Sequence, residues 1–314
     1  MSTGERTPSG LAHLRRQGYA IVGRHSAVKL CHWTKKRLHG RGMCYKEKFY
    51  GIQCHRCVQM SPMLDRCTLQ CQFCWRHMTW QESAAKGMDD PDAIVEGCID
   101  AQRKLLTGYG GNPNVNRKLL REANEPNQCA ISLTGEPAMY PHLDGLIQAL
   151  EKKGMGTFLV TNGTFPEAIE RLQRLPTQLY VSVTAPDKQT YDKLCSPFGA
   201  RGWTQLQKTL ELFPSLSCRT VIRHTLVKGW NMHGIDAYAK LDLKASPMFI
   251  EAKGFSFVGE SRLRMRAENM PAHPEIREWA RELANATGYS ILDEQVESRV
   301  VLLGKDQGNR IDSR

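Results

Sequence analysis

Cysteine placement constrains this sequence more than any other feature. Seven of the eleven cysteines fall between Cys31 and Cys74 of the 314-residue chain. Thiols that only fill an apolar core would be spread along strands, whereas thiolates that bind metal have to be gathered. The first residues, MSTGERTPSG, lack the apolar stretch of a signal peptide, which indicates a reducing, cytoplasmic compartment without a disulfide framework. The sequence therefore predicts a metal-binding region.

Three of these cysteines lie within eight residues. Cys67, Cys71 and Cys74 form a C-x3-C-x2-C pattern, and the aromatic Phe73 directly precedes the third thiol. Three thiolates can hold a [4Fe-4S] cluster with one open iron, which the amino and carboxylate groups of S-adenosylmethionine (SAM) can chelate. A zinc site is the alternative, although zinc motifs usually pair C-x2-C with a second such pair or with histidines.

A second set of cysteines precedes the first. Cys31, Cys44 and Cys57 are separated by 13 positions each time. Three spaced thiolates can hold a second cluster, whose open iron would be a Lewis acid able to bind the carboxylate of a small acid. Cys54 forms a C-x2-C unit with Cys57, so it is the alternative third ligand.

One lysine accompanies this second set. Lys46 lies two residues after Cys44, in the run CYK. A lysine beside a metal site can have a lowered pKa, and its free amine can then form a Schiff base with a ketone. The alternative is an ordinary solvated surface lysine.

The chain beyond about residue 60 alternates short β-rich runs with helical stretches, a pattern typical of βαβ units around a parallel sheet. Six such units predict an α/β fold, a partial (βα)6 barrel spanning 61–260, with a cysteine-rich extension at 1–60 and a C-terminal extension at 261–314. We expect strands at 128–134, 156–161, 179–184, 219–226 and 247–251, with an earlier one near 63–67. We expect helices at 91–107, 142–153, 166–174, 204–213 and 233–241, then an amphipathic helix (PEIREWARELANAT) and an apolar run (SRVVLLG).

Polar residues mark the ends of the predicted strands. Gly135 and Glu136 close the second strand, Thr161 and Asn162 end the next, and Ser182 lies on the fourth. Ligands of a βα barrel bind at the carboxyl ends of its strands. Taken singly, a Gly-Glu pair is also a common turn, and Ser182 could be an ordinary strand serine.

The charge of the chain suits a polyanionic partner. Lys and Arg number 43 against 32 Asp and Glu, a formal net charge of +11. Two basic clusters are candidates for RNA contacts, with a solvated charge run as the alternative. They comprise Lys35, Lys36, Arg37, His39 and Arg41, and then Arg262, Arg264 and Arg266. No run of about 18 apolar residues appears, so no membrane span is expected.

The first cysteine set, with Phe73, resembles the signature loop of the radical SAM superfamily, which follows the first strand of a partial barrel. Gly135 and Glu136, in SLTGEP, look like the Gly-Glu motif that contacts the SAM amino group. This resemblance implies that Thr161, Asn162 and Ser182 also contribute to the SAM site.

A narrower resemblance extends from about residue 18 to about residue 300. The runs HSAVKLCHW, CYKEKFYGI, HRC, FCWR, LVTNG, LYVSV and KGFSFVGESRLRMRAENMPAH look like the tRNA 4-demethylwyosine synthases, stand-alone archaeal type. The resemblance implies two [4Fe-4S] clusters, with Cys57 preferred over Cys54 in the second. It implies that pyruvate forms a Schiff base with Lys46 and condenses with 1-methylguanosine beside the anticodon of tRNA-Phe. An external one-electron donor of flavodoxin or ferredoxin type would be needed.

Two other functions remain open at this point. One is a radical SAM enzyme with an auxiliary cluster that acts on another substrate, such as a peptide. The other is a non-catalytic RNA-binding protein whose cysteines hold zinc.

Overall fold

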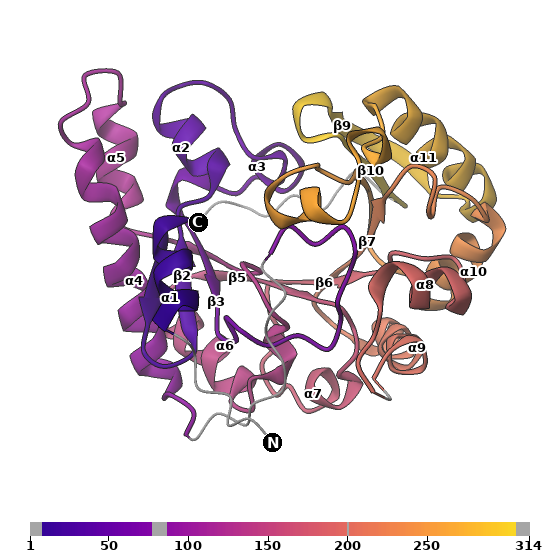
Figure 1. The fold of residues 1–314 in the computed structure, drawn as a ribbon, viewed down its shortest axis with the longest axis horizontal. Helices are drawn as coiled ribbons and strands as arrows, with labels where there is room; N and C mark the ends of the chain where they lie inside the picture. The colour runs from indigo at the N-terminus through magenta and orange to yellow at the C-terminus, as the bar shows by residue number, and fades with distance from the viewer. Residues whose placement is uncertain (1–7, 77–86, 200, 306–314) are drawn as a thin grey trace.

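Six parallel strands form the centre of the fold (Figure 1). The computed structural model describes residues 8–76, 87–199 and 201–305. Strands β3 to β8 lie side by side in chain order, and every neighbouring pair is parallel. Their bounds are β3 (Cys57–Ser61), β4 (Gln128–Ile131), β5 (Gly156–Thr161), β6 (Gln178–Ser182), β7 (Arg219–Leu226) and β8 (Phe249–Gly254). The predicted partial (βα)6 barrel is confirmed.

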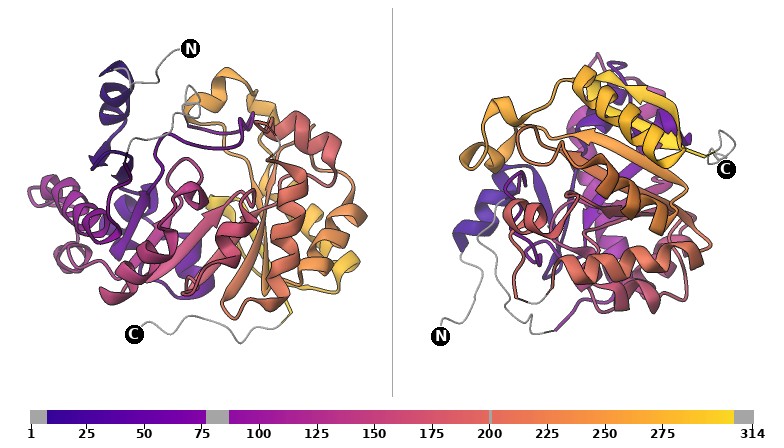
Figure 2. Two further views of the ribbon diagram at one scale, coloured as in Figure 1. Left: turned by 90° about the horizontal axis from the view of Figure 1, so that it is seen from below. Right: turned by 90° about the vertical axis from the view of Figure 1, so that its right-hand side faces the viewer.

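Antiparallel strands extend both edges of this sheet. The hairpin β1 (Tyr19–Val22) and β2 (Ser26–Lys29) pairs with β3, while β10 (Val300–Gly304) pairs with β8 and carries β9 (Ser290–Gln295). Within the described residues the outermost strands β1 and β9 are not neighbours, so the sheet does not close. Figure 1 and the right-hand view of Figure 2 show the yellow C-terminal elements at one edge.

The expected first strand near 63–67 is wrong in position. The strand is β3, which begins at Cys57 and ends at Ser61. Pro62 follows directly, and because proline cannot donate a hydrogen bond to a ladder, it ends the strand there. Residues 63–67 therefore belong to the loop that carries the first cysteine set.

Helices cover the outer face of the sheet, where apolar side chains such as Leu159, Val181 and Ile222 are fully buried. These helices are α4 (Pro91–Leu106), α6 (Leu143–Lys152), α7 (Pro166–Glu170), α8 (Lys188–Cys195), α9 (Trp203–Leu212), α10 (Ile235–Ala245) and α11 (His273–Thr287). Asp90 caps α4 by accepting hydrogen bonds from the N–H groups of Asp92 and Ala93. No helix in the described ranges has the length and apolarity to cross a bilayer.

One short helix packs on the inner face. We call α3 (Tyr45–Tyr50) the plug. Since side chains alternate along a strand, Phe158 and Tyr180 point away from the outer helices and toward the inside of the barrel. Three aromatic residues of the plug, Tyr45, Phe49 and Tyr50, are buried in one apolar cluster with these strand residues. Cys44, directly before the plug, is thus carried on a segment built into the barrel.

Candidate active site

The first cysteine set, which we call the loop triad (Cys67, Cys71 and Cys74), lies on the loop after β3. Burial, and then Glu136 and Cys74, raise the pKa of Cys67 to about 12. A hydrogen bond with Cys195, then burial, raise the pKa of Cys71, and both other triad thiols add to this shift. The three thiols therefore lie within electrostatic reach of one another. They stay protonated until a metal takes the place of their protons.

The loop triad is held by the end of helix α8. The Gln70 N–H donates to the Cys195 carbonyl at 2.9 Å, and the Gln72 N–H donates to the Leu194 carbonyl at 2.8 Å. The last carbonyls of a helix have no partner inside the helix, so the loop supplies donors that would otherwise be missing. The helix end thus fixes the path of the loop between its cysteines.

Arg264 holds the other side of the loop. Its Nε donates to the Gln72 carbonyl at 3.2 Å, and its Nη2 donates to the Cys74 carbonyl. The half-buried guanidinium, which the sequence predicts as an RNA contact, thus bridges two carbonyls of one loop. On the barrel side, the Asn162 amide donates to the Cys67 sulfur at 3.6 Å.

A cavity of about 170 Å³ adjoins the loop triad at the carboxyl ends of the strands. Every SAM-binding residue predicted from the sequence lines it: Phe73, Gly135, Glu136, Thr161, Asn162 and Ser182. Ser132, Thr184, Tyr191 and Thr225 line it too, and sequence reasoning missed them. Ser132, Thr184 and Thr225 belong to the same strand-end pattern as Ser182, which could have revealed them. A second cavity, of about 200 Å³, is lined by all three cysteines of the loop triad.

Gly135 and Glu136 serve different purposes. Gly135 has φ +66°, and a Cβ there would lie 1.9 Å from the Met63 carbonyl oxygen, so only glycine lets the loop approach. The Glu136 carboxylate is 1% exposed and accepts hydrogen bonds from the Thr161 hydroxyl at 2.6 Å and the Asn162 N–H at 2.7 Å. Burial raises its pKa to about 7. A buried carboxylate of this kind is stabilised by a ligand ammonium group.

The second set, which we call the spaced triad (Cys31, Cys44 and Cys57), comes from three elements. Cys31 precedes α2 (His32–Leu38), Cys44 precedes the plug, and Cys57 begins β3. Burial and then Cys31 raise the pKa of both Cys44 and Cys57 to about 12. The fold therefore brings the three thiols together from positions far apart in the sequence. Within the described residues, no three Cys, His, Asp or Glu side chains are gathered as ligands of a single metal ion.

Cys54 lies beside this triad in a different role. Its side chain is 2% exposed, and its sulfur accepts a hydrogen bond from the Cys44 N–H at 3.5 Å. Burial, then a hydrogen bond with Glu47, raise its pKa, whereas Cys31 contributes to the shift of Cys57. Cys57 is therefore the thiol whose electrostatics are coupled to Cys31, whereas Cys54 interacts with the backbone of Cys44 and with Glu47.

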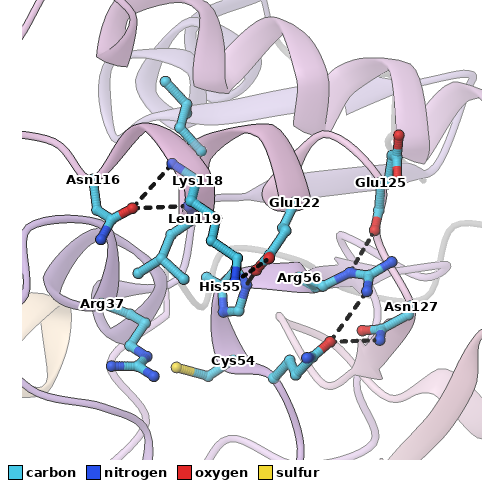
Figure 3. Close-up of polar contacts among 12 residues, drawn as sticks. Arg37, Cys54, His55, Arg56, Asn116, Lys118, Leu119, Glu122, Glu125 and Asn127 are labelled. Atoms are coloured by element: carbon cyan, nitrogen blue, oxygen red, sulfur yellow. Dashed lines mark hydrogen bonds and ion pairs between the residues drawn. The ribbon is translucent and has the colours of Figure 1, made fainter. Parts of the chain in front are cut away.

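The turn that carries Cys54 is anchored from outside the barrel. His55 bonds to the Glu122 carboxylate at 2.7 Å, and Arg56 Nε donates to the Glu125 carbonyl at 2.8 Å (Figure 3). These partners belong to α5 (Arg117–Ala123) and the residues just after it, within the excursion between α4 and β4. The excursion thereby fixes the approach to Cys57.

Lys46 projects from the plug into the barrel. It is 9% exposed, and its Nζ lies 4.9 Å from the centroid of the Phe158 ring and 4.3 Å from that of Tyr180. Burial, and then the charge of Arg223, lower its pKa. Lys48, two residues on, is 42% exposed and pairs with Asp293 at 2.6 Å. Lys46 is therefore no ordinary surface lysine, and its amine is disposed toward the neutral, nucleophilic form.

A buried polar network surrounds Lys46. The fully buried Glu251 carboxylate accepts hydrogen bonds from Tyr50 at 2.7 Å, Tyr45 at 3.2 Å and Arg223 Nε at 2.8 Å. Lys253, on the same strand as Glu251, donates to the Ser298 carbonyl at 2.7 Å. Sequence reasoning missed this network. The sequence feature that could have revealed it is the charged residues at alternate positions of the otherwise apolar strands β7 and β8.

Comparison with known proteins decides the family. A model of the radical SAM superfamily matches residues 61–241, and one described as wyosine base formation matches residues 244–305. An S-adenosyl-L-methionine-dependent tRNA 4-demethylwyosine synthase of Pyrococcus abyssi is 52% identical, across 98% of this chain and 93% of its own length. The chain belongs to the tRNA 4-demethylwyosine synthase family. It is thus a radical SAM enzyme that uses SAM and a [4Fe-4S] cluster, as its sequence predicts.

Solved relatives of this synthase family share the whole fold. A structure of TYW1 with a lysine-pyruvate adduct bound has a TM-score of 0.88 and 36% identity, and covers 98% of both chains. A crystal structure of archaeal TYW1 has a TM-score of 0.81 and 34% identity, and covers 98% of this chain and 99% of its own. The human synthase is 38% identical over 95% of this chain, which spans 41% of that protein's length.

Proposed function

We propose that this enzyme condenses 1-methylguanosine, beside the anticodon of tRNA-Phe, with pyruvate to form the tricyclic base 4-demethylwyosine. The observation that carries the proposal is Lys46, a buried amine over the rings of Phe158 and Tyr180, whose strands β5 and β6 also line the SAM cavity. The solved structure of TYW1 with a lysine-pyruvate adduct bound supports the same chemistry.

The loop triad and the strand ends fit the first cluster and SAM. Cys67, Cys71 and Cys74 would ligate three irons, and the buried Glu136 carboxylate would accept from the amino group of SAM. Thr161, Asn162 and Ser182 line the rest of the cavity, and Phe73 lies against it. When bound, the cluster and SAM supply the radical chemistry at the N1-methyl group that no side chain offers. An external flavodoxin- or ferredoxin-type donor would provide the electron.

The spaced triad fits a second [4Fe-4S] cluster. Cys31, Cys44 and Cys57 would be its ligands, and Cys54 would stabilise the backbone of Cys44. The Lys46 amine attacks C2 of pyruvate, and the ketone oxygen leaves as water, so that an imine forms. The aromatic surroundings of Lys46 exclude bulk water, which would reverse this step.

The proposed RNA surface is the exposed part of α2. Lys35 is exposed on α2 and Arg41 is exposed just after it, and phosphates of an anticodon loop would pair with such side chains in a salt-dependent manner. Arg37 is already paired with Glu47 at 3.1 Å, and Lys36 lies 5.0 Å from the Trp33 ring centroid. The cytoplasm is the proposed compartment because the free thiols need reducing conditions.

We propose that three consecutive segments of the chain have different roles. Residues 1–60 would carry the ligands of the second cluster, and 61–260 would form the SAM-binding barrel. Residues 261–314 would form a C-terminal extension, in which Arg264 contacts the loop that carries the first cysteine set.

The direct test is base formation by the reconstituted protein. We would incubate it without oxygen with dithionite, SAM, pyruvate and tRNA bearing 1-methylguanosine, and then analyse the digested RNA by mass spectrometry. The tricyclic base is expected from the wild-type protein and from Lys48→Ala, whose lysine lies on the same helix but outside the barrel. Lys46→Ala should form none. Cleavage of SAM without any change in the nucleoside would overturn the substrate assignment.

A further inference from the structure

The inner face of the barrel holds more positive than negative side chains. Three basic residues, Lys46, Arg223 and Lys253, lie there. Even with the Lys46 amine neutral, the other two cations outnumber Glu251, which is the one carboxylate of this network within the described residues. Buried charges are stable only when they are paired or bound to a ligand. The inside of the barrel therefore has an excess of positive charge, which a bound anion beside Lys46 would neutralise.

The strand register places two of these cations next to the SAM cavity. Arg223 pairs with Ser182 of β6, and Lys253 pairs with Thr225 of β7. Both Ser182 and Thr225 line the cavity. Arg223 and Lys253 are thus one strand away from the place where radical chemistry would occur.

Arg223 also shares an aromatic ring with Lys46. The Arg223 Cζ lies 4.5 Å from the centroid of Tyr180, and the Lys46 Nζ lies 4.3 Å from it. A short molecule attached to the Lys46 amine would therefore lie within reach of the guanidinium. The aromatic wall of Phe158 and Tyr180 suits a small apolar group on the same molecule.

Both cations keep donors for a ligand. Arg223 uses Nε for Glu251 and Nη2 for the Tyr45 hydroxyl at 2.7 Å, and among the described residues no partner of its Nη1 is recorded. The Lys253 ammonium has three N–H donors and uses one of them for the Ser298 carbonyl. A planar carboxylate matches this combination of a guanidinium and an ammonium.

We propose that Arg223 and Lys253 form a carboxylate subsite for the short 2-oxo acid whose ketone reacts with Lys46. The proposal rests on the proposed function, which supplies the Lys46 imine. Glu251 is the positioning residue, because it fixes Arg223 and both tyrosine hydroxyls without an atom left over for the ligand. The subsite would select a charged 2-oxo acid over an uncharged ketone.

The test is trapping of the imine by borohydride in the reconstituted enzyme. Borohydride adds hydride to C2, water supplies the proton on nitrogen, and the resulting secondary amine is read as a mass increase on the Lys46 peptide. The probes are pyruvate and methyl pyruvate, which keeps the ketone but lacks the charge. For the wild-type enzyme, half-maximal trapping should need about tenfold to a hundredfold less pyruvate than ester, the effect of losing a charge-assisted hydrogen bond.

Two variants remove the cations without leaving a lone buried charge. Lys253→Met keeps the length of the side chain, and Arg223→Gln combined with Glu251→Gln removes one charge of each sign. Each should lower the preference for pyruvate over its ester about tenfold. Arg219→Met is the matched control, because Arg219 lies on the same face of β7 but contacts the rings of Tyr50 and Phe249. It should keep the wild-type preference.

The outcomes distinguish failure of the proposed function from failure of the subsite proposal. If the wild-type enzyme traps no pyruvate on Lys46, the proposed function fails. If the wild-type enzyme and both variants trap pyruvate with the same preference over the ester, the subsite proposal is overturned. The open iron of the second cluster would then be the group that holds the carboxylate.

Discussion

Each triad consists of three thiols, but the two sets are brought together in opposite ways. The loop triad places its ligands within eight residues, so the covalent chain alone keeps them near one another. The three thiols of the spaced triad come from the residue before α2, the residue before the plug and the first residue of β3. The first set is a local motif held from outside, and the second exists only when the barrel is folded.

The residues that surround the two triads therefore have different roles. Around the loop triad, the end of α8 and Arg264 hold a backbone path. Around the spaced triad, the protein also places a buried lysine, because Lys46 lies on the plug, which begins directly after Cys44. A site assembled from distant segments can place a nucleophile and its metal group on one element.

The roles of the two triads should differ most clearly in activity when one cysteine is removed from each. Cys71→Ala is expected to abolish SAM cleavage, because the cluster that would bind SAM loses a ligand. Cys57→Ala should retain SAM cleavage but form no tricyclic base. Deoxyadenosine and the modified nucleoside can be measured in the same reaction by chromatography. Loss of SAM cleavage in both variants would show that the triads do not function separately.

Glu136→Gln should affect the loop triad's cavity alone. The amide keeps the shape of the side chain but removes the charge that would face the amino group of SAM. We expect SAM to bind about tenfold more weakly or worse, since a hydrogen bond to a charged group contributes about 1.5–3 kcal/mol. Equilibrium binding of SAM measures this, and the iron content should match that of the wild-type protein. Unchanged affinity would exclude Glu136 as a SAM ligand.

Arg264→Met should loosen the loop triad without touching the spaced one. The change removes two hydrogen bonds to the loop backbone, at Gln72 and Cys74. Iron should leave the loop cluster several-fold to about tenfold faster in the presence of a chelator. Arg262→Met is the control, because Arg262 Nε donates to the Phe257 carbonyl, outside the loop. Equal release rates in the two variants would contradict the clamping role of Arg264.

Cys54→Ala should produce the smallest change. Its sulfur accepts one hydrogen bond from the Cys44 N–H, so the free energy of unfolding should fall by about 1 kcal/mol. Denaturant unfolding measures that change, and iron analysis should find no loss from the spaced triad. If iron fell to the level found for Cys57→Ala, Cys54 would be a ligand instead.

The residues that the sequence singles out for the SAM site line one cavity together with two cysteines of the loop triad, because both sets come from short motifs. Cys67, Glu136 and Asn162 lie at the ends of consecutive strands, and strand ends meet at one edge of a parallel barrel. The first strand was misplaced because buried Met63 and Leu64 resemble strand residues, while Pro62 decides where the strand ends.

The sequence could not predict the network around Glu251. Arg223, Glu251 and Lys253 alternate with apolar residues, a pattern that usually marks a strand with one solvated face. Here the plug covers that face, and its position depends on contacts across the whole chain. Lys46 was identified through a family resemblance, because nothing within its own segment reveals that the segment enters a barrel.

The position of the plug in the chain also affects when the spaced triad can form during synthesis. The Tyr45 hydroxyl meets Glu251 across 206 positions of the chain. At about 5–20 residues per second, the ribosome delivers that partner roughly ten to forty seconds after the plug has been made. Until then Cys44 has no barrel to enter, and its thiol stays accessible to oxidants and to chaperones. Cluster insertion at the spaced triad is therefore expected to follow completion of the chain.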